Sequence, residues 1–158
     1  MPPITATVLC KNAAQTLPAT LASLAHFSEV LIVDTGSSDS TMEIAKGYPN
    51  VRIVQTPFQG FGKTHHFASR SASHDWILSI DSDEVVSEDL AKEIGSLALD
   101  PKAVYSLNRC NYFNGKKIKC CAGWHPDPVL RLFHRKETDF TEAAVHETVR
   151  TEGLRIIA

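Results

Sequence analysis

The sequence lacks a long apolar run, since no stretch approaches the ~18 residues that a membrane span needs. It also lacks, in its first twelve residues MPPITATVLCKN, the basic and then apolar pattern of a secretory leader. We therefore expect a cytoplasmic protein. Its 158 residues, 43% of them hydrophobic, suffice for one buried core and are too few to suggest two domains.

Cysteine is scarce, and its spacing disfavours both disulfide bonds and a zinc site. Two of the four cysteines are adjacent and awkward to bridge internally, so we expect reduced thiols. The candidate zinc ligands contain no C-x₂-C or H-x₃₋₅-H pair, which disfavours a zinc site. These residues are Cys110, Cys120, Cys121, His125, His134 and His146.

Charge is nearly balanced overall, at −2, but it is divided unevenly along the chain. Residues 1–100 hold 6 Lys and Arg against 12 Asp and Glu, whereas residues 101–158 hold 10 against 6. The basic second half is either a solvated face or a surface for an anionic partner, such as a phosphorylated sugar or an acidic lipid. Aromatic residues are not interleaved with these charges at regular spacing, so nucleic acid is not favoured.

Hydrophobic patterning predicts an α/β fold. Expected strands lie at 4–10, 30–33, 51–54 and 76–80, and expected helices lie at 17–24, from the 34–39 turn to about 46, at 64–73 and at 88–99. This alternation indicates a mostly parallel central sheet with helices on both faces. After residue 101, the expected strands 103–108, 118–121, 129–134 and 143–149, with a hairpin turn at 114–115, indicate a mixed or antiparallel part.

Acidic side chains follow two of the expected strands. Asp34 and Asp81 come directly after buried runs, and ligands of such sheets bind beyond the carboxyl ends of the strands. In an extended segment Asp81 and Asp83 would point to one side and could share a divalent cation, Mg²⁺ or Mn²⁺, while Glu84 would point away. The alternative is that Asp83 and Glu84 are solvated charges at a helix start.

A phosphate-binding loop is a competing interpretation of Gly60–Thr64, which lies between an expected strand and an expected helix. That loop requires Gly-x-x-x-x-Gly-Lys-Ser/Thr, and the position of its first glycine is occupied by Pro57. Proline has neither the backbone freedom nor the N–H that the loop uses. A P-loop-like NTPase is therefore the weaker alternative.

Four segments, in this order, resemble the inverting, GT-A-fold glycosyltransferases of family 2, and especially the bacterial branch that adds a sugar to the lipopolysaccharide core. The segments are ITATVLCKNAAQTLPATLASL, VLIVDTGSSDSTMEIAKGY, FQGFGKTHHFASRSASHDWILSIDSDE and WHPDPVLRLFHR followed by VHETV. The combination of VDTGSSDST, DWILSIDSDE and the late RLFHR with VHE carries the resemblance. It spans nearly the whole chain.

The resemblance implies a nucleotide-sugar site. Asp34 would contact the uracil of a UDP-sugar, Asp81 and Ser82 would lie near the ribose in a DXD motif, and Asp83 would bind the metal. Carboxylates accept well from uracil N3–H and ribose hydroxyls, and a divalent cation neutralises the departing diphosphate. The base that takes the acceptor proton would be Glu147 or Asp127, of which we prefer Glu147.

Further expectations concern binding. Lys63 could meet the diphosphate, and Arg131 could face the acceptor or the diphosphate. Trp124 and His125 could form a stacking wall for a sugar. His66 departs from the asparagine that is common at this position in the family.

The chain is expected to be one family 2 domain over 1–158, with a nucleotide-sugar-binding half at 1–100 and an acceptor-side half at 101–158. Family members usually continue for many tens of residues beyond VHETV, so the chain is either a truncated form or a short homologue. The expected activity is transfer of a hexose, glucose by preference, from a UDP-sugar to a lipopolysaccharide core acceptor, with peripheral contact at the anionic inner face of the cytoplasmic membrane. A catalytically incomplete nucleotide-sugar-binding fragment is the alternative.

Overall fold

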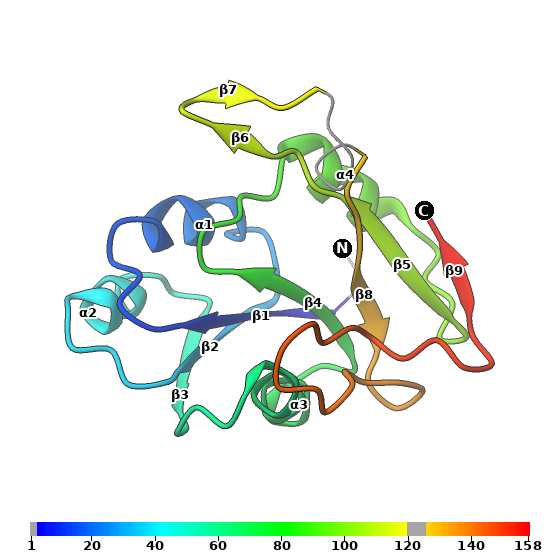
Figure 1. Ribbon diagram of the computed structural model, residues 1–158, viewed down its shortest axis with the longest axis horizontal. Coiled ribbons are helices and arrows are strands. Elements are labelled where there is room, and N and C mark those ends of the chain that lie inside the picture. The colour runs from blue at the N-terminus through cyan, green and yellow to red at the C-terminus, as the bar shows by residue number, and fades with distance from the viewer. Residues whose placement is uncertain (1–2, 120–125) are drawn as a thin grey trace.

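The computed structural model describes residues 3–119 and 126–158, and it confirms the α/β fold class. A seven-stranded sheet has the order β3-β2-β1-β4-β8-β5-β9, and β6 and β7 form a separate hairpin (Figure 1). The strands are β1 Ile4–Cys10, β2 Glu29–Asp34, β3 Val51–Gln55, β4 Trp76–Asp81, β5 Ala103–Asn108, β6 Tyr112–Phe113, β7 Lys116–Lys117, β8 Pro128–His134 and β9 Arg155–Ile157. The helices are α1 Leu17–Ser23, α2 Thr41–Lys46, α3 Phe61–Ser71 and α4 Glu88–Ser96.

The first four strands are parallel, as the alternation of strands and helices predicts. Successive side chains of β2 enter opposite cores, because residues along a strand alternate between the two faces of the sheet. Val30 and Ile32 belong to one cluster of buried residues, and Leu31 and Val33 belong to another. Burial on both faces accounts for the uninterrupted apolar run at 30–33.

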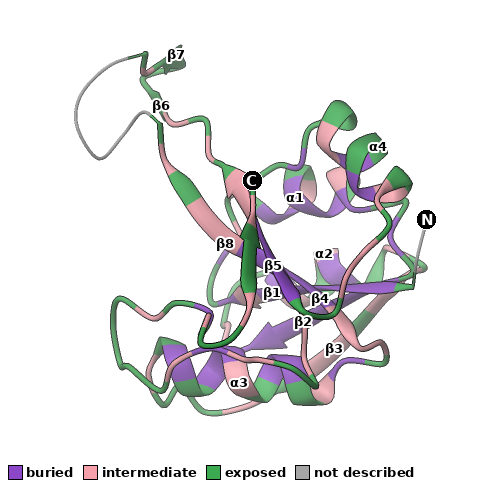
Figure 2. Ribbon diagram, turned by 90° about the vertical axis from the view of Figure 1, so that its right-hand side faces the viewer, coloured by how far each residue is buried: buried purple, intermediate pink, exposed green. Residues whose placement is uncertain are grey.

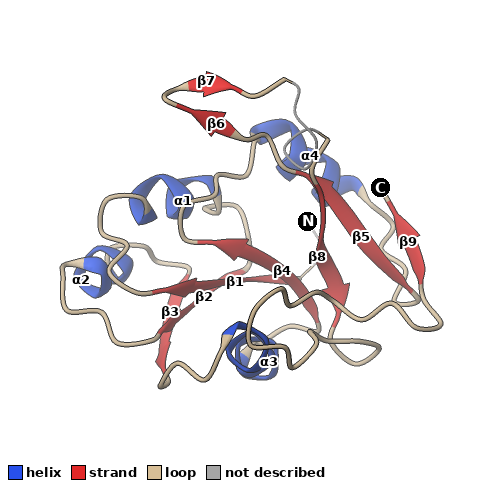
Figure 3. Cartoon of the chain, in the orientation of Figure 1, coloured by secondary structure: helices blue, strands red, loops and turns tan. Residues whose placement is uncertain are grey.

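Helices cover both faces, as Figures 2 and 3 show. The core on one face contains Leu17 and Leu21 of α1, Ala45 of α2 and Ile94 of α4. On the other face, Ala68 of α3 packs with residues from the C-terminal part of the chain, including Phe133, Phe140 and Val149. None of the helices in 3–119 and 126–158 is both long and apolar enough to cross a bilayer.

The C-terminal part is mixed, as expected. Strand β8 is antiparallel to both β4 and β5, whereas β9 is parallel to β5. The expected strand at 143–149 is wrong: a loop occupies 141–148, and only an isolated bridge joins Phe140 to Val149. The segment lacks the burial and the backbone conformation of a strand, since Val145 is exposed and His146 has a φ of 57°. The pattern also failed to indicate β9.

The predicted turn at Asn114-Gly115 is confirmed. Both residues have positive φ, 48° and 73°, as a two-residue hairpin turn requires. The hairpin pairs Tyr112 with Lys117 and Phe113 with Lys116, and it stands away from the rest of the chain in Figures 1 and 2. Residues 118–119 are not a strand, and the rest of the expected strand at 118–121 lies outside the described residues.

Candidate functional site

Asp34 and Asp81 lie on either side of β1 at the carboxyl edge of the parallel strands. In the sheet register Cys10 pairs with Asp34, and the adjacent Leu9 pairs with Asp81. Because neighbouring strands are about 4.8 Å apart, the Cα atoms of the two aspartates, two strands apart, are about 10 Å from each other. Beside them is a hollow of about 310 Å³, lined by Leu9, Cys10, Lys11, Thr35, Phe58, Phe61 and Ser82. The hollow thus lies at the carboxyl edge of the sheet, next to the chain neighbours of both aspartates, where a ligand of this fold is expected.

Asp34 is fixed within the turn that follows β2. It is 1% exposed, and its carboxylate accepts hydrogen bonds from the Ser37 backbone N–H at 3.0 Å and from Gln55 Nε2 at 3.1 Å. Burial alone would raise the pKa of Asp34, but hydrogen bonds from Ser37 and Gln55 hold it below its usual value. The carboxylate is therefore ionised and pre-oriented at neutral pH.

Arg131 of β8 joins the two ends of the turn that follows β4. Its Nη2 lies 2.7 Å from Asp81 Oδ2 and 3.1 Å from Glu84 Oε1. Glu84 Oε2 also accepts the backbone N–H of Asp81, and the backbone N–H of Glu84 donates to the Asp81 carbonyl. Burial raises the pKa of Glu84. At Asp81 burial would also raise the pKa, but the charge and the hydrogen bond of Arg131, together with nearby positive charge, lower it.

This turn overturns the expectation that residues 81–83 continue in extended form. The segment is a tight turn, so Asp81 and Asp83 are not neighbours on one side of a strand. Glu84, which was expected to point away, shares Arg131 with Asp81. Asp83 is exposed and has no ion pair within the described residues. Position in sequence could not reveal this because Arg131 is supplied by a strand 50 residues away.

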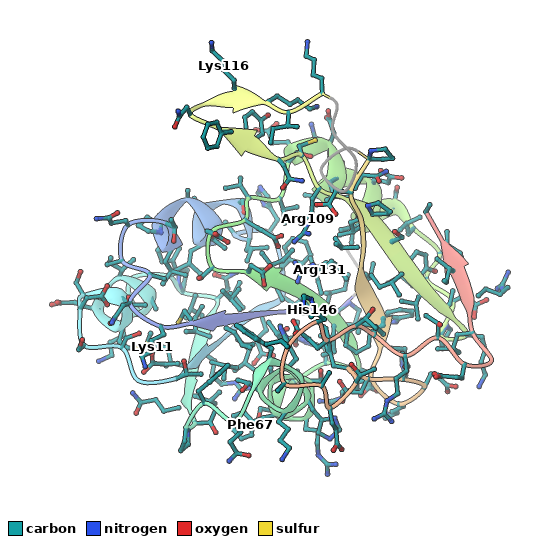
Figure 4. All side chains as sticks on the ribbon, viewed as in Figure 1. Lys11, Phe67, Arg109, Lys116, Arg131 and His146 are labelled. Carbon is teal, nitrogen blue, oxygen red and sulfur yellow. The ribbon has the colours of Figure 1, made fainter. Side chains whose placement is uncertain are left out.

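A second arginine extends the charge network towards the β6–β7 hairpin. Arg109 places Nη1 3.6 Å from Glu84 Oε1 and Nε 2.9 Å from Asp127 Oδ2. Asn111 Nδ2 also donates to Asp127 Oδ2 at 2.8 Å, and the hydrogen bonds from Asn111 and Arg109 lower the pKa of Asp127. Figure 4 labels Arg109 and Arg131 between the hairpin and the loop that holds His146. With two donors already bound, Asp127 is a weaker proton acceptor than an uncommitted carboxylate.

Glu147 lies in the loop at 141–148. Burial would lower the pKa of Arg131, but the charges of Asp81, Glu84 and Glu147 raise it. The Glu147 side chain is 20% exposed, and its Oε1 lies 3.6 Å from Nε2 of the buried His65. Burial lowers the pKa of His65 to about 4, so its ring is neutral at pH 7. Glu147 therefore keeps a solvent-reachable carboxylate without a charged histidine beside it.

His65 belongs to the site, although the sequence did not indicate a role for it. Its ring stacks on Phe140, with centroids 4.3 Å apart and planes 18° apart, and its Nδ1 lies 3.4 Å from Ser79 Oγ of β4. The helical period of α3 could have found it, since buried Thr64, His65 and Ala68 share the face that covers the sheet.

The start of α3 holds the loop of Glu147 in place. The backbone N–H of Phe61 donates to the Ala144 carbonyl at 3.1 Å, and that of Gly62 donates to Ala143 at 3.0 Å. A Cβ on Gly62 would lie 2.2 Å from the Thr141 carbonyl oxygen, so only glycine permits this approach. The helix starts at Phe61, before the predicted residue 64.

Lys63 and Ser82 are not brought together. Ser82 lines the hollow beside β1, and its carbonyl accepts from Thr20 Oγ1 at 3.1 Å. Lys63 lies on the outer face of α3, where it lines a separate groove of about 450 Å³ with Gln59, His66, Phe67, Arg70, Ser71 and Glu142. The lysine that borders the first hollow is Lys11. Trp124, His125, Cys120 and Cys121 lie outside the described residues.

The residues present fit a divalent cation held jointly with a ligand, not by protein alone. Within 3–119 and 126–158 no group of three or more His, Cys, Asp or Glu side chains is arranged to hold a metal ion. Asp81 and Glu84 already share Arg131, which leaves Asp83 as the uncommitted carboxylate of the turn. Mg²⁺ is commonly bound in this way, by one or two carboxylates together with phosphate oxygens and water.

Residues 5–147 match the profile described as Glycosyl transferase family 2. The lipopolysaccharide core biosynthesis glycosyltransferase LpsC of Rhizobium meliloti is 28% identical over 163 residues, which cover 96% of this chain and 58% of LpsC. The chain thus spans little more than half the length of that relative.

Two solved structures show the same fold at low identity. TarS of Staphylococcus aureus in complex with UDP has a TM-score of 0.66 at 19% identity, over 90% of this chain and 52% of that one. The glucosyl-3-phosphoglycerate synthase of Mycobacterium tuberculosis, in complex with Mn²⁺, UDP and phosphoglyceric acid, has a TM-score of 0.51 at 22% identity, over 65% and 43%.

Proposed function

The chain belongs to glycosyl transferase family 2, and we propose that it transfers a hexose from a UDP-sugar to an acceptor hydroxyl with inversion at the anomeric carbon. The observation that carries this proposal is the placement of Asp34 and Asp81 on either side of β1, beside a hollow of about 310 Å³. Two structures with the same fold support the proposal, because one is a complex with UDP and the other a complex with UDP and Mn²⁺.

For the nucleotide, we assign Asp34 to the uracil and Asp81 with Ser82 to the ribose. The Asp34 carboxylate accepts hydrogen bonds from the Ser37 backbone N–H and from Gln55 Nε2, which fix it at the end of β2, and a carboxylate is a good acceptor for a uracil N3–H. Phe58 and Phe61 line the hollow and offer it aromatic surface. Lys11 borders the hollow and is better placed than Lys63 to approach a diphosphate, because Lys63 is on the outer face of α3.

For the reaction, we assign Glu147 as the base. The acceptor hydroxyl gives its proton to the Glu147 carboxylate while its oxygen bonds to the anomeric carbon. The bond from that carbon to the diphosphate oxygen breaks, and its electron pair leaves with UDP. A Mg²⁺ or Mn²⁺ ion held by Asp83 would neutralise the negative charge on the leaving diphosphate. Arg131 and Arg109 add positive charge along the same edge.

His65 acts on Glu147 rather than on the sugar. A neutral ring with Nε2–H directed to Glu147 can orient the carboxylate without protonating it, and the stack on Phe140 holds the ring plane. The 3.6 Å separation is longer than a hydrogen bond, and such contacts often shorten only when substrate is bound.

The acceptor we propose is a lipopolysaccharide core sugar, with glucose as the preferred donor sugar. The relationship to LpsC supports this class of acceptor. The second half of the chain, with 10 Lys and Arg against 6 Asp and Glu, suits a phosphorylated acceptor and contact with an anionic membrane surface at the cytoplasmic side. We retain the division into a nucleotide half, 1–100, and an acceptor-side half, 101–158.

The proposal is tested by isothermal titration of UDP and UDP-sugars, with and without Mn²⁺, followed by a transfer assay on core oligosaccharide. Metal-linked UDP binding and transfer are expected, and the absence of metal-linked UDP binding contradicts the proposal. UDP binding without transfer, unchanged in Glu147→Gln, would instead indicate the nucleotide-binding fragment.

The P-loop alternative is disfavoured by the contacts of the candidate loop. The backbone N–H groups of Phe61 and Gly62, which a phosphate loop would direct at its ligand, donate to the carbonyls of Ala144 and Ala143. Family membership favours the glycosyltransferase as well.

A further inference from the structure

The β6–β7 hairpin carries the two most exposed large apolar side chains of the described residues. Tyr112 is 63% exposed and Phe113 is 71% exposed. They are adjacent on one short strand, at a place where the chain projects from the rest of the structure (Figures 1 and 2). Adjacent exposed aromatic rings at a projecting tip are typical of an interaction surface and not of a solvated loop.

All charged side chains of the same hairpin are basic. Lys116, Lys117 and Lys119 are exposed, and none of them forms an ion pair within 3–119 and 126–158. The sequence has no acidic residue between Asp100 and Asp127, so no nearby carboxylate on this segment offsets their charge. Figure 4 shows the Lys116 side chain extending outward from the tip. The segment therefore presents positive charge beside apolar surface.

Strand pairing combines the two kinds of side chain on both faces of the hairpin. Tyr112 is directly opposite Lys117, and Phe113 is directly opposite Lys116. Because directly opposed residues share a face and successive residues alternate, each face has one aromatic ring and one lysine. Each face of the hairpin is therefore mixed, and neither face is wholly apolar or wholly polar.

We propose that this hairpin, Tyr112–Lys119, docks the protein on the surface of an anionic lipid bilayer. Tyrosine and phenylalanine rings are stable at the level of the headgroups, and lysines are attracted by anionic lipids while their alkyl stems remain in apolar surroundings. A two-stranded hairpin outside the main sheet is marginally stable in water by itself, so a surface that buries its rings would also stabilise it.

The position of the hairpin relates this surface to the candidate site. Asn111, at the base of the hairpin, accepts the Ile118 backbone N–H through its carbonyl and donates from its side chain to Asp127. Asp127 forms an ion pair with Arg109, which also contacts Glu84, and Glu84 in turn pairs with Arg131. Docking would hold the acceptor-side edge of the site near the bilayer, and this consequence rests on the proposed function with a lipid-linked acceptor.

The test is co-sedimentation of the whole chain with vesicles of phosphatidylethanolamine and phosphatidylglycerol, which present an anionic surface, against phosphatidylcholine vesicles. The parent is expected to bind the anionic vesicles and to lose binding as salt is raised. Lys116→Gln/Lys117→Gln should weaken binding about tenfold or more, since each lysine near the surface adds to the attraction. Tyr112→Ser/Phe113→Ser should weaken it further at high salt, where the apolar contribution remains.

The matched control is Lys46→Gln/Lys92→Gln, which removes the same charge from exposed positions on α2 and α4. Equal loss in the control and the hairpin variant overturns the proposal, because it would indicate attraction by net charge alone. Equal binding to anionic and neutral vesicles, or no binding by the parent, also overturns it. A dimer in sedimentation equilibrium that Tyr112→Ser/Phe113→Ser converts to monomer would show that a second copy of the chain is the occupant instead.

Titration of UDP with each variant separates this inference from the proposed function. The hairpin has no contact with the hollow beside β1, so UDP binding is expected to be unchanged in all of the variants. If UDP binding is retained and the hairpin substitutions do not change binding to the vesicles, only the docking surface is refuted. Loss of UDP binding in the parent would refute the proposed function and leave the vesicle result to stand by itself.

Discussion

Arg131 Nη2 of β8 lies 2.7 Å from Asp81 Oδ2 at the end of β4, and the two residues are 50 positions apart in the sequence. The same guanidinium nitrogen also reaches Glu84 Oε1 at 3.1 Å. Arg131 is buried, so its charge is compensated by these carboxylates and not by water. The turn that carries Asp83 is therefore closed by an ion pair between two antiparallel strands.

Arg131→Met should lower the free energy of unfolding by about 3 kcal/mol, because it removes the cation that bonds both Asp81 and Glu84 in a partly buried site. The measurement is urea denaturation at pH 7. Arg131→Lys should lose less stability but not recover it fully, since an ammonium cannot present the planar fork of donors. Arg150→Met, at an exposed position, is the control and should change little; equal effects at the two positions would contradict a central role for the ion pair.

Glu147→Gln should reduce kcat by about 10²- to 10⁴-fold, the usual contribution of a general base, while the affinity for the donor stays close to that of the parent. Steady-state kinetics with a saturating UDP-sugar measure this. Glu142→Gln changes an exposed glutamate of the same loop that lines the groove on the outer face of α3, so its activity should stay within about twofold of the parent. A fully active Glu147→Gln variant would transfer the base assignment to Asp127.

His65→Gln should lower kcat more than it changes the KM for the donor, because it removes the ring that orients Glu147 but touches no nucleotide contact. It should also change the pH profile of kcat, because the ring lies 3.6 Å from the carboxylate to which we assign the proton transfer. Ser79→Ala should have a smaller effect in the same direction, as its contact with His65 is 3.4 Å. A uniform loss of activity at every pH, matched by loss of folded protein, would indicate a structural role alone.

Asp83→Ala and Glu84→Gln should affect different properties. Asp83 is exposed and has no ion pair within the described residues, so its loss should leave stability within ~0.5 kcal/mol of the parent and remove the Mn²⁺ dependence of UDP binding. Glu84 bonds both Arg131 and the Asp81 backbone, so Glu84→Gln should reduce stability by ~1–2 kcal/mol. Thermal unfolding and UDP titration with Mn²⁺ measure the two effects, and identical behaviour of the two variants would argue against this division.

Glu29 should make stability fall in acid. Burial alone would raise the pKa of Glu29, but hydrogen bonds from Thr5, Ser73 and Arg52 lower it from 4.5 to about 2. Because the folded pKa is the lower one, the stabilisation is complete above pH 4.5 and is lost as the pH falls from 4.5 towards 2. It amounts to about 3 kcal/mol at most.

The variant Glu29→Gln should therefore be less stable than the parent at pH 7 and approach it near pH 2. Urea denaturation at several pH values measures the difference, and Glu43→Gln, an exposed glutamate on α2, is the control. A gap between Glu29→Gln and the parent that stays constant from pH 7 to pH 2 would contradict the assigned cause.

The sequence by itself determined the architecture of the first hundred residues. Continuous apolar strands that alternate with helices are typical of a parallel sheet covered on both faces. The strands expected at 4–10, 30–33, 51–54 and 76–80 agree with the structure within one residue at either end. It also located the hairpin turn at Asn114-Gly115 and the edge of the sheet that holds Asp34 and Asp81. These features follow from local composition and from strand order.

Only the tertiary structure decided the contacts between distant segments. We expected a strand at 143–149, yet the backbone there bonds to the start of α3 at Phe61 and Gly62, and it forms a loop that carries Glu147 to His65. Arg131 likewise closes the turn after Asp81 and changes the expected direction of Glu84. Periodicity reports how one segment alternates between apolar and polar surroundings, whereas these contacts depend on which segments the sheet order brings together.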